Sequence, residues 1–329
     1  MRRFILILSV LFIIATACSS AEVSSPPSHS LLEFPNGLTV NYDDGITEYE
    51  RELIDFVIEN VDKFIFQKSG LNIAGTVYVT SSRAQYISKL MEFFGYNQTT
   101  AENASVRSKG ITHQHKGIVL INLELIRELH LNDDPAIKQA KTDHEIFFVV
   151  AHEWYHIAQA MLSWGWSSFS NTPSWITEAT ANKAADYVIT AATCMDLGEI
   201  SKFGIVIQDK ECSEQEIFEK TYNTLSLRFM ATQDVYYTPF LYLMSQYGIM
   251  PANIFYKELG NYAATLGLNR ETFTGENFVA YQNSSWETSL MKVYGIENEN
   301  QLFADSIRYV DTNIEDIQNR ALIVARHSR

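Results

Sequence analysis

The pattern of apolar and polar positions changes character along the chain. In the first part, short apolar runs typical of strands alternate with stretches of helical periodicity. The expected strands are 37–42, 73–80 and 118–122, and the expected helices are 47–67 and 82–94, the second ending at Gly95. From Thr142 onward the pattern is almost wholly helical. A small mixed sheet with helices, followed by helices alone, predicts an α+β protein.

The first residues have a different pattern, which indicates export. Arg2 and Arg3 precede an apolar run over 4–14 that is too short for a comfortable transmembrane helix. Cys18 follows three small residues and resembles the lipobox of bacterial lipoproteins. We therefore expect removal of residues 1–17, lipid on Cys18 and an anchor to a bacterial membrane in the cell envelope. The alternative is an ordinary signal peptide with a chance cysteine.

The remaining chain is expected to have three parts. Residues 18–31 are rich in serine and proline and predict a flexible tether. Residues 32–141 form an α/β subdomain, and 142–329 a helical subdomain. Removal of residues 1–17 takes away two arginines and no acidic residue, so the formal charge falls from −14 to −16. This charge argues against a nucleic-acid partner, which would need a basic face. The oligomeric state stays open.

One helical stretch carries the strongest candidate chemistry. His152, Glu153 and His156 stand in an apolar run that Thr142 or Asp143 could cap. Because positions i and i+4 lie on one helix face, both imidazoles point the same way and can share one metal ion. Glu153 can reach a water on that metal, as in the HExxH zinc site.

A second helix is expected to begin at Pro173, capped from residues 171–172. Its Glu178 supplies a third ligand, and three protein ligands with one open position are typical of a catalytic zinc. A ligating histidine usually gives its other N–H to an oxygen, which Asn182 or Asp186 could provide. The alternative is that these groups are satisfied polar side chains inside a helix pair.

HEWYH at 152–156 followed by PSWITEATAN at 173–182 resembles the gluzincins, the thermolysin-like clan of zinc metallopeptidases. More narrowly, it resembles the bacterial peptidase-MA-like proteins, whose second motif reads roughly P-x-W-x-x-E-G-x-A. The resemblance implies a zincin-like fold that binds one Zn²⁺. It implies His152, His156 and Glu178 as its ligands, with Glu153 as the general base.

Two positions depart from the family pattern. Ala179 stands where the family usually has glycine, and because alanine is small and a better helix former we expect it to be tolerated. Asn182 stands where thermolysin has an aspartate, so the surroundings of the ligands are neutral at that position.

The resemblance also implies how a substrate is held. In gluzincins an edge strand just upstream of the HExxH helix binds the extended substrate, and 117–122 is the matching segment. A Tyr or His from a later helix often donates to the oxyanion, and the stretch 234–248 resembles that helix. Tyr236 is the preferred candidate and Tyr237 the second. Packing of both in the core is the alternative.

Two further pairs have an open reading. His113 and His115 alternate on one strand face and could bind a second metal, but a polar strand face near a turn is the favoured interpretation. Cys194 and Cys212 could pair outside the cytoplasm and close a loop after the helix of Glu178. The alternative is two buried thiols.

The sequence thus predicts a zinc-dependent peptidase that hydrolyses peptides or proteins with a glutamate-activated water. The competing hypothesis is a catalytically silent lipoprotein on the same scaffold, acting as a binding or structural protein of the envelope. Zinc content and hydrolysis of a peptide library distinguish the two.

Overall fold

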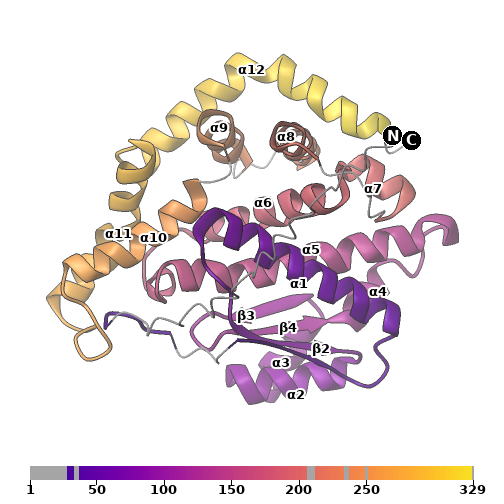
Figure 1. The fold of residues 1–329 in the computed structure, drawn as a ribbon, viewed down its shortest axis with the longest axis horizontal. Coiled ribbons are helices and arrows are strands. Elements are labelled where there is room, and N and C mark those ends of the chain that lie inside the picture. The colour runs from indigo at the N-terminus through magenta and orange to yellow at the C-terminus, as the bar shows by residue number, and fades with distance from the viewer. Residues whose placement is uncertain (1–27, 33–36, 206–211, 233–236, 249–250, 328–329) are drawn as a thin grey trace, which may run out of the picture.

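The computed structural model describes residues 28–32, 37–205, 212–232, 237–248 and 251–327, and it confirms the α+β class (Figure 1). The elements in chain order are β1 (Leu38–Tyr42), α1 (Glu48–Ser69), β2 (Gly75–Thr80), α2 (Arg83–Phe94), α3 (Gln98–Ser105), β3 (Gly110–His113), β4 (Ile118–Asn122), α4 (Leu123–Leu129), α5 (Pro135–Leu162), the 3₁₀ turn η1 (Trp166–Ser168), α6 (Ser174–Thr193), α7 (Leu197–Phe203), α8 (Glu214–Thr232), α9 (Tyr237–Tyr247), α10 (Pro251–Thr265), α11 (Glu276–Tyr294) and α12 (Glu299–His327). The helices and strands predicted before residue 95 are all present, within two residues at nearly every end.

The four strands form one mixed sheet in the order β1-β2-β4-β3. β1, β2 and β4 are parallel, and β3 pairs antiparallel with β4 through a hairpin. The prediction that 117–122 is the edge strand is therefore wrong, because the hairpin places β3 outside it. The burial of the two strands agrees with this order. Residues 119–121 are completely buried, as expected for an inner strand covered on both faces, whereas β3 is half-buried throughout.

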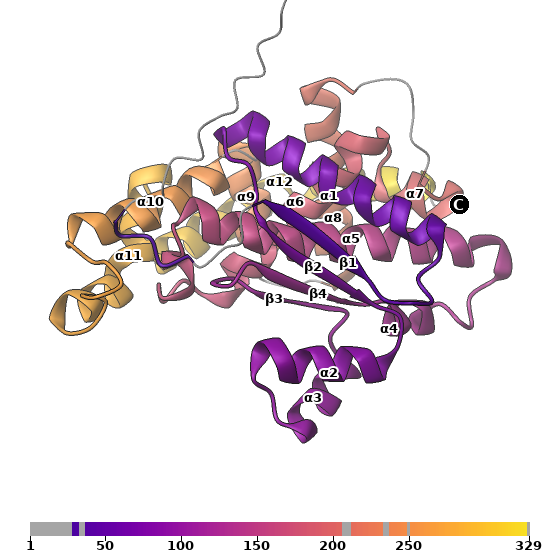
Figure 2. The same cartoon turned by 60° about the horizontal axis from the view of Figure 1, so that its bottom comes forward.

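Helices cover both faces of the sheet and then build further layers on one side. Figures 1 and 2 show α2 and α3 on one face and α5 with α1 on the other. Beyond α5 lie α6, then α8 and α9, and α12 arches over these two. The main core runs from the α5 side of the sheet to α12 and includes Val77 of β2, Phe147 of α5 and Val188 of α6, whereas α2 and α3 pack on a separate small core. The predicted boundary between the two subdomains, at residue 142, falls within α5. The division into two subdomains stays a prediction.

Helix α5 begins seven residues earlier than expected. Pro135 occupies its first position, where a missing N–H costs nothing, and the carbonyl of Asp134 accepts from the next free amides. Thr142 and Asp143 are not caps: the Thr142 hydroxyl donates to the Lys138 carbonyl at 3.0 Å. Helix α6 begins at Ser174, one residue after the predicted start at Pro173. It has no side-chain cap, so capping from residues 171–172 is also wrong.

Two further predictions concern the disulfide and the N-terminal segment. Cys194 and Cys212 form a disulfide with their Cα atoms 5.5 Å apart, as proposed. Residues 1–17 and Cys18 lie outside the described residues. The last part of the expected tether is docked rather than loose, since the Leu31 amide donates to the Trp164 carbonyl at 2.9 Å. Within the described ranges, no helix has the length and apolar character needed to span a membrane.

Candidate metal centre

Trp154 and Tyr155 of the HEWYH motif connect α5 to two other helices. Trp154 is fully buried, and its indole N–H donates to Asp62 of α1 at 2.7 Å. The Tyr155 hydroxyl donates to Asn253 of α10 at 2.8 Å. These contacts fix α5 in the core, and its His152 and His156 side chains face Glu178 of α6.

Three potential ligand atoms converge between α5 and α6. Nε2 of His152 lies 3.1 Å from Nε2 of His156 and 3.2 Å from Oε2 of Glu178. Nε2 of His156 lies 3.7 Å from Oε1 of Glu178. Tetrahedral zinc with bonds of about 2.0–2.1 Å separates its ligand atoms by about 3.3 Å. The two nitrogens and the two oxygens of Glu178 lie near this spacing, and one ligand atom from each residue lies within 4.8 Å of the other two, so the group could hold a metal ion.

The electrostatics of this group favour a positive charge. Hydrogen bonds to the two imidazoles hold the pKa of Glu178 well below its ordinary value. Burial acts to lower the pKa of His156, but the contact with Glu178 and the charges of Glu153 and Glu178 outweigh it, so this pKa is raised. A place that draws protons onto buried nitrogens is also a place that attracts a cation.

Gln159 fixes the outer side of His156. Its amide N–H₂ donates to the Thr177 carbonyl and the Thr180 hydroxyl at 3.0 and 2.8 Å, which directs Oε1 toward His156. Nδ1 of His156 donates to that oxygen at 2.7 Å, so Nε2 keeps its lone pair for a metal. The sequence predicted that Asn182 or Asp186 would provide this oxygen, and the structure has Gln159 in that position instead.

Asp186 has a different role, and the proposal that it supports a ligand histidine is wrong. Its carboxylate accepts two hydrogen bonds from Arg228 of α8, at 2.8 and 2.9 Å. The outer nitrogen of His152, Nδ1, is buried and has no hydrogen-bond partner among the described residues. The two ligand rings therefore differ in how firmly the protein orients them.

Edge strand β3 positions Glu153. The Thr112 hydroxyl lies 2.7 Å from Oε2 of Glu153 and 3.0 Å from its backbone carbonyl oxygen. A Cβ on Gly110 would come within 2.6 Å of the Glu153 Cγ, so only glycine leaves room for this side chain. Strand and helix together hold the carboxylate beside the ligand group.

These residues line one cleft of about 270 Å³. Residues 110–112 and Gln114 form the strand side, and His152, Glu153, His156 and Glu178 form the helix side. Tyr236 lies outside the described residues, so its role as an oxyanion donor stays a prediction. Tyr237 is half-buried at the start of α9 and packs against the main core.

A second group of possible metal ligands is structural. Asp196 caps α7 by accepting from the Glu199 amide at 2.9 Å, and Glu199 pairs with Lys220 at 2.7 Å. His327 contacts Asp196, which completes the group. His113 and His115 belong to neither possible metal group found in the described part of the chain; both line a pocket beside the cleft.

Sequence reasoning missed Gln159, Thr112 and Gly110. Gln159 follows His156 by three positions and so shares its helix face, a signal that was available. The two strand residues become visible only once β3 is known to lie against α5. Comparisons with protein-family models, curated proteins and solved structures found no match for this chain.

Proposed function

We propose that this protein is a zinc-dependent metallopeptidase that acts on peptides or proteins in the cell envelope. The observation that carries the proposal is the convergence of one potential ligand atom from each of three residues, all within 4.8 Å of one another, in the same cleft as Glu153. His152, His156 and Glu178 would hold the ion. Zinc is favoured over harder cations because two of the three donors are imidazoles.

Zinc bound there would supply a Lewis acid and lower the pKa of a water ligand toward about 7. The protein's own residues perform the remaining tasks. A carboxylate oxygen of Glu153 accepts the proton of the attacking water and then passes it to the leaving amine. Thr112 donates to Oε2 of Glu153, which orients the carboxylate and leaves Oε1 for the proton.

The substrate would lie along β3. An extended peptide that adds to this edge strand gains main-chain hydrogen bonds beside the ligand group. Tyr236 remains the predicted oxyanion donor. The predicted signal and Cys18 would anchor the protein to a membrane outside the cytoplasm.

The test is hydrolysis of a diverse peptide library by the zinc-loaded protein, with and without a chelator. We expect cleavage that the chelator abolishes and added zinc restores. Zinc binding without cleavage of any peptide would instead identify a binding or structural lipoprotein on this scaffold. Cleavage that a chelator leaves unchanged would contradict the proposal, since the metal would have no part in it.

A further inference from the structure

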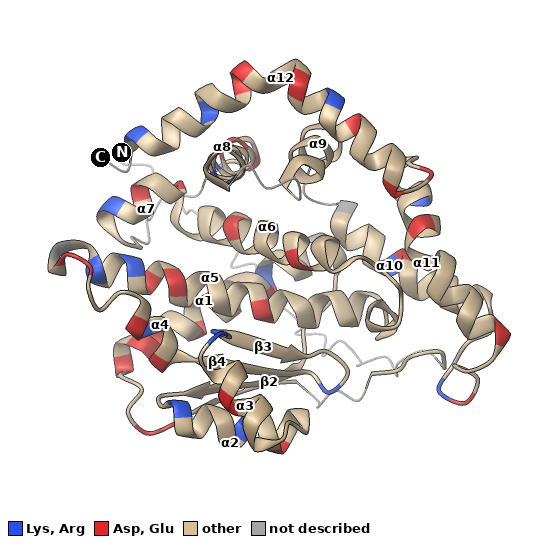
Figure 3. Cartoon of the chain, turned by 180° about the vertical axis from the view of Figure 1, so that it is seen from behind, with Lys and Arg blue, Asp and Glu red and all other residues tan. Residues whose placement is uncertain are grey.

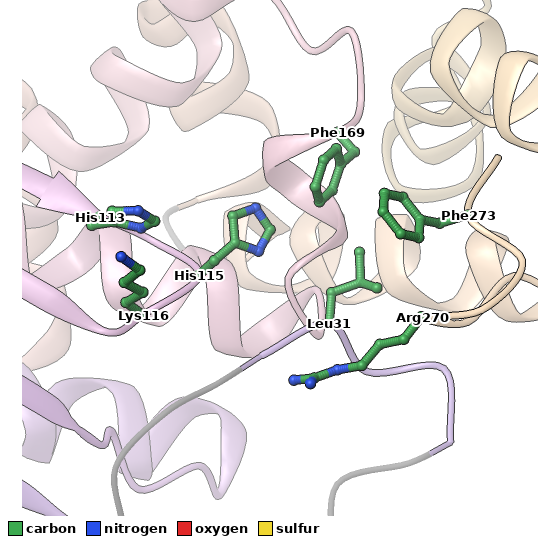
Figure 4. A pocket seen from close by; sticks show the side chains of 7 residues that line it. All are labelled: Leu31, His113, His115, Lys116, Phe169, Arg270 and Phe273. Atoms are coloured by element: carbon green, nitrogen blue, oxygen red, sulfur yellow. The ribbon is translucent and has the colours of Figure 1, made fainter. Parts of the chain in front are cut away.

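A second pocket of about 470 Å³ adjoins the metal cleft at the turn between β3 and β4. Figure 4 shows its lining: His113, His115 and Lys116 from the hairpin, Phe169 after η1, and Leu31, Arg270 and Phe273 on the far side. We call it the basic-aromatic pocket. It contains basic and apolar side chains, and no acidic residue is among the described residues that line it.

This lining contrasts with the rest of the protein. The chain has 39 acidic and 25 basic residues, and Figure 3 shows the acidic positions spread along the helices. A pocket with a lysine, an arginine and two imidazoles therefore stands out as a local place for negative charge. Arg270 is tied to the segment that contributes Leu31 to the pocket, since its guanidinium donates to the backbone carbonyls of Ser30 and Leu32.

The basic-aromatic pocket and the metal cleft share their wall. Gln114 lines the cleft, whereas its neighbours His113 and His115 line the pocket. The Ser168 hydroxyl holds this wall by donating to Oε1 of the Gln114 side chain at 2.5 Å, and the next residue, Phe169, lies in the pocket.

The distance along the strand fits a peptide. Thr112 lies beside Glu153, and His115 is three residues further along the hairpin. β3 ends at His113 and residues 114–117 form the turn, so the rise of about 3.3 Å per residue applies only as far as His113, which already lines the pocket. A peptide paired with β3 would thus place a side chain, or its own end, in the pocket.

The apolar walls define the rest of the ligand. The rings of Phe169 and Phe273 lie 5.8 Å apart, and the His115 ring lies 4.8 Å from Phe169. Such walls suit the methylene or aromatic part of a side chain, while the lysine and imidazole groups suit a carboxylate.

We propose that the basic-aromatic pocket binds a substrate carboxylate within about three residues of the scissile bond. This inference rests on the proposed peptidase function. The carboxylate could be that of a Glu or Asp side chain or that of the peptide's C-terminus, and the two sources share the same chemistry. The pocket would thereby direct the enzyme toward acidic or C-terminal segments.

The test uses two series of fluorogenic peptides. In the first, a single Glu, or Gln as its neutral counterpart, is scanned through each position on both sides of the scissile bond. In the second, the peptide ends two or three residues beyond that bond with a free carboxylate or an amide. The kcat/KM of the zinc-loaded protein is measured, and peptide affinity is measured separately by fluorescence anisotropy on zinc-loaded Glu153→Gln.

We expect the acid to exceed its neutral counterpart by about 5- to 10-fold at one position, as suits a partly exposed charge pair. The ratio should fall toward one in Lys116→Gln and in His115→Gln, and at about 0.5 M salt. Lys63→Gln is the matched control, because it removes one exposed lysine of α1 and should keep the wild-type ratio.

Equal values for acid and neutral peptides at every position, or a ratio that Lys116→Gln leaves unchanged, would overturn the proposal. If no peptide is cleaved but the anisotropy shows a preference that depends on Lys116, the pocket is supported and the peptidase function fails. If neither cleavage nor binding discriminates the carboxylate, the pocket proposal fails as well.

Discussion

Helices α5 and α6 carry two sets of histidine and carboxylate side chains, about two turns apart. In the cleft, His152 and His156 of α5 meet Glu178 of α6. Deeper in the protein, His144 of α5 and Asp186 of α6 line one small cavity. Phe148 lies between the two sets, with its ring 6.2 Å from His144 and 6.1 Å from His152.

The two sets differ in where their cation comes from. Arg228 supplies it in the buried set, through two hydrogen bonds to Asp186 and a position 4.9 Å over the Phe148 ring. In the cleft, the described lining includes Glu153 and Glu178 but no lysine or arginine. The side chain of Glu178 is also 56% exposed. The same residue types therefore make an ion pair where the protein provides the positive charge, and a group that could hold a metal ion where the solution must provide that charge.

Glu153→Gln would remove the proposed base and leave the ligand set intact. We expect kcat to fall by about 10²- to 10⁴-fold, because the amide cannot accept the proton. Bound zinc, measured by elemental analysis, should stay at the wild-type level. Full activity in this variant would refute the assignment of the base and remove the functional difference between the two sets.

Arg228→Met would break the buried set. It leaves the Asp186 carboxylate buried without its partner, and we expect a loss of about 3–5 kcal/mol in the free energy of unfolding. Denaturant unfolding measures this value. The double variant Arg228→Met/Asp186→Leu is the control, and it should recover most of the loss since no unpaired charge remains. If Arg228→Met were as stable as wild type, the ion pair between Arg228 and Asp186 would not contribute to the free energy of unfolding.

His144 should make stability depend on pH. Burial, together with the nearby Arg228, lowers its pKa from 6.5 to about 4. The unfolded chain therefore binds a proton that the folded protein resists, and stability is lost as the pH falls from about 6.5 toward 4. Between pH 7 and pH 5 this amounts to about 2 kcal/mol. In His144→Gln that component should vanish, so an equal pH dependence of unfolding in both proteins would contradict it.

Thr112→Val tests the strand contact of the cleft. It keeps the side-chain shape but removes the hydroxyl that holds Glu153, and we expect kcat to fall by about 10-fold, typical of one lost hydrogen bond to a charged group. Thr112→Ser should retain most of the activity. Zinc affinity should be equal in both variants; a parallel loss of zinc would mean that Thr112 supports the fold rather than the base.

Local signals in the sequence predicted much of the fold and the ligand set. Ser82 and Gly95 mark the ends of α2 as expected, with Gly95 in the left-handed conformation. His152, His156 and Glu178 were predicted from motif spacing alone, and the structure brings them together.

The errors arose where distant segments decide the outcome. The edge position of β3 depends on a hairpin of which only the second strand, 118–122, was clear from the sequence. The partner of Asp186 is Arg228, 42 residues away, and no local pattern indicates that contact. The contact between Thr112 and Glu153 spans 41 residues and likewise depends on how the sheet packs against α5.

The central claim is that the cleft set binds one metal ion and the buried set binds none. The most direct measurement is a calorimetric titration of zinc into the metal-free protein, compared with Glu178→Ala and Asp186→Asn. We predict one ion per wild-type chain and a similar affinity in Asp186→Asn. In Glu178→Ala we predict an affinity lower by more than about 100-fold. Absence of zinc binding by the wild-type protein, or unchanged binding by Glu178→Ala, would contradict the account.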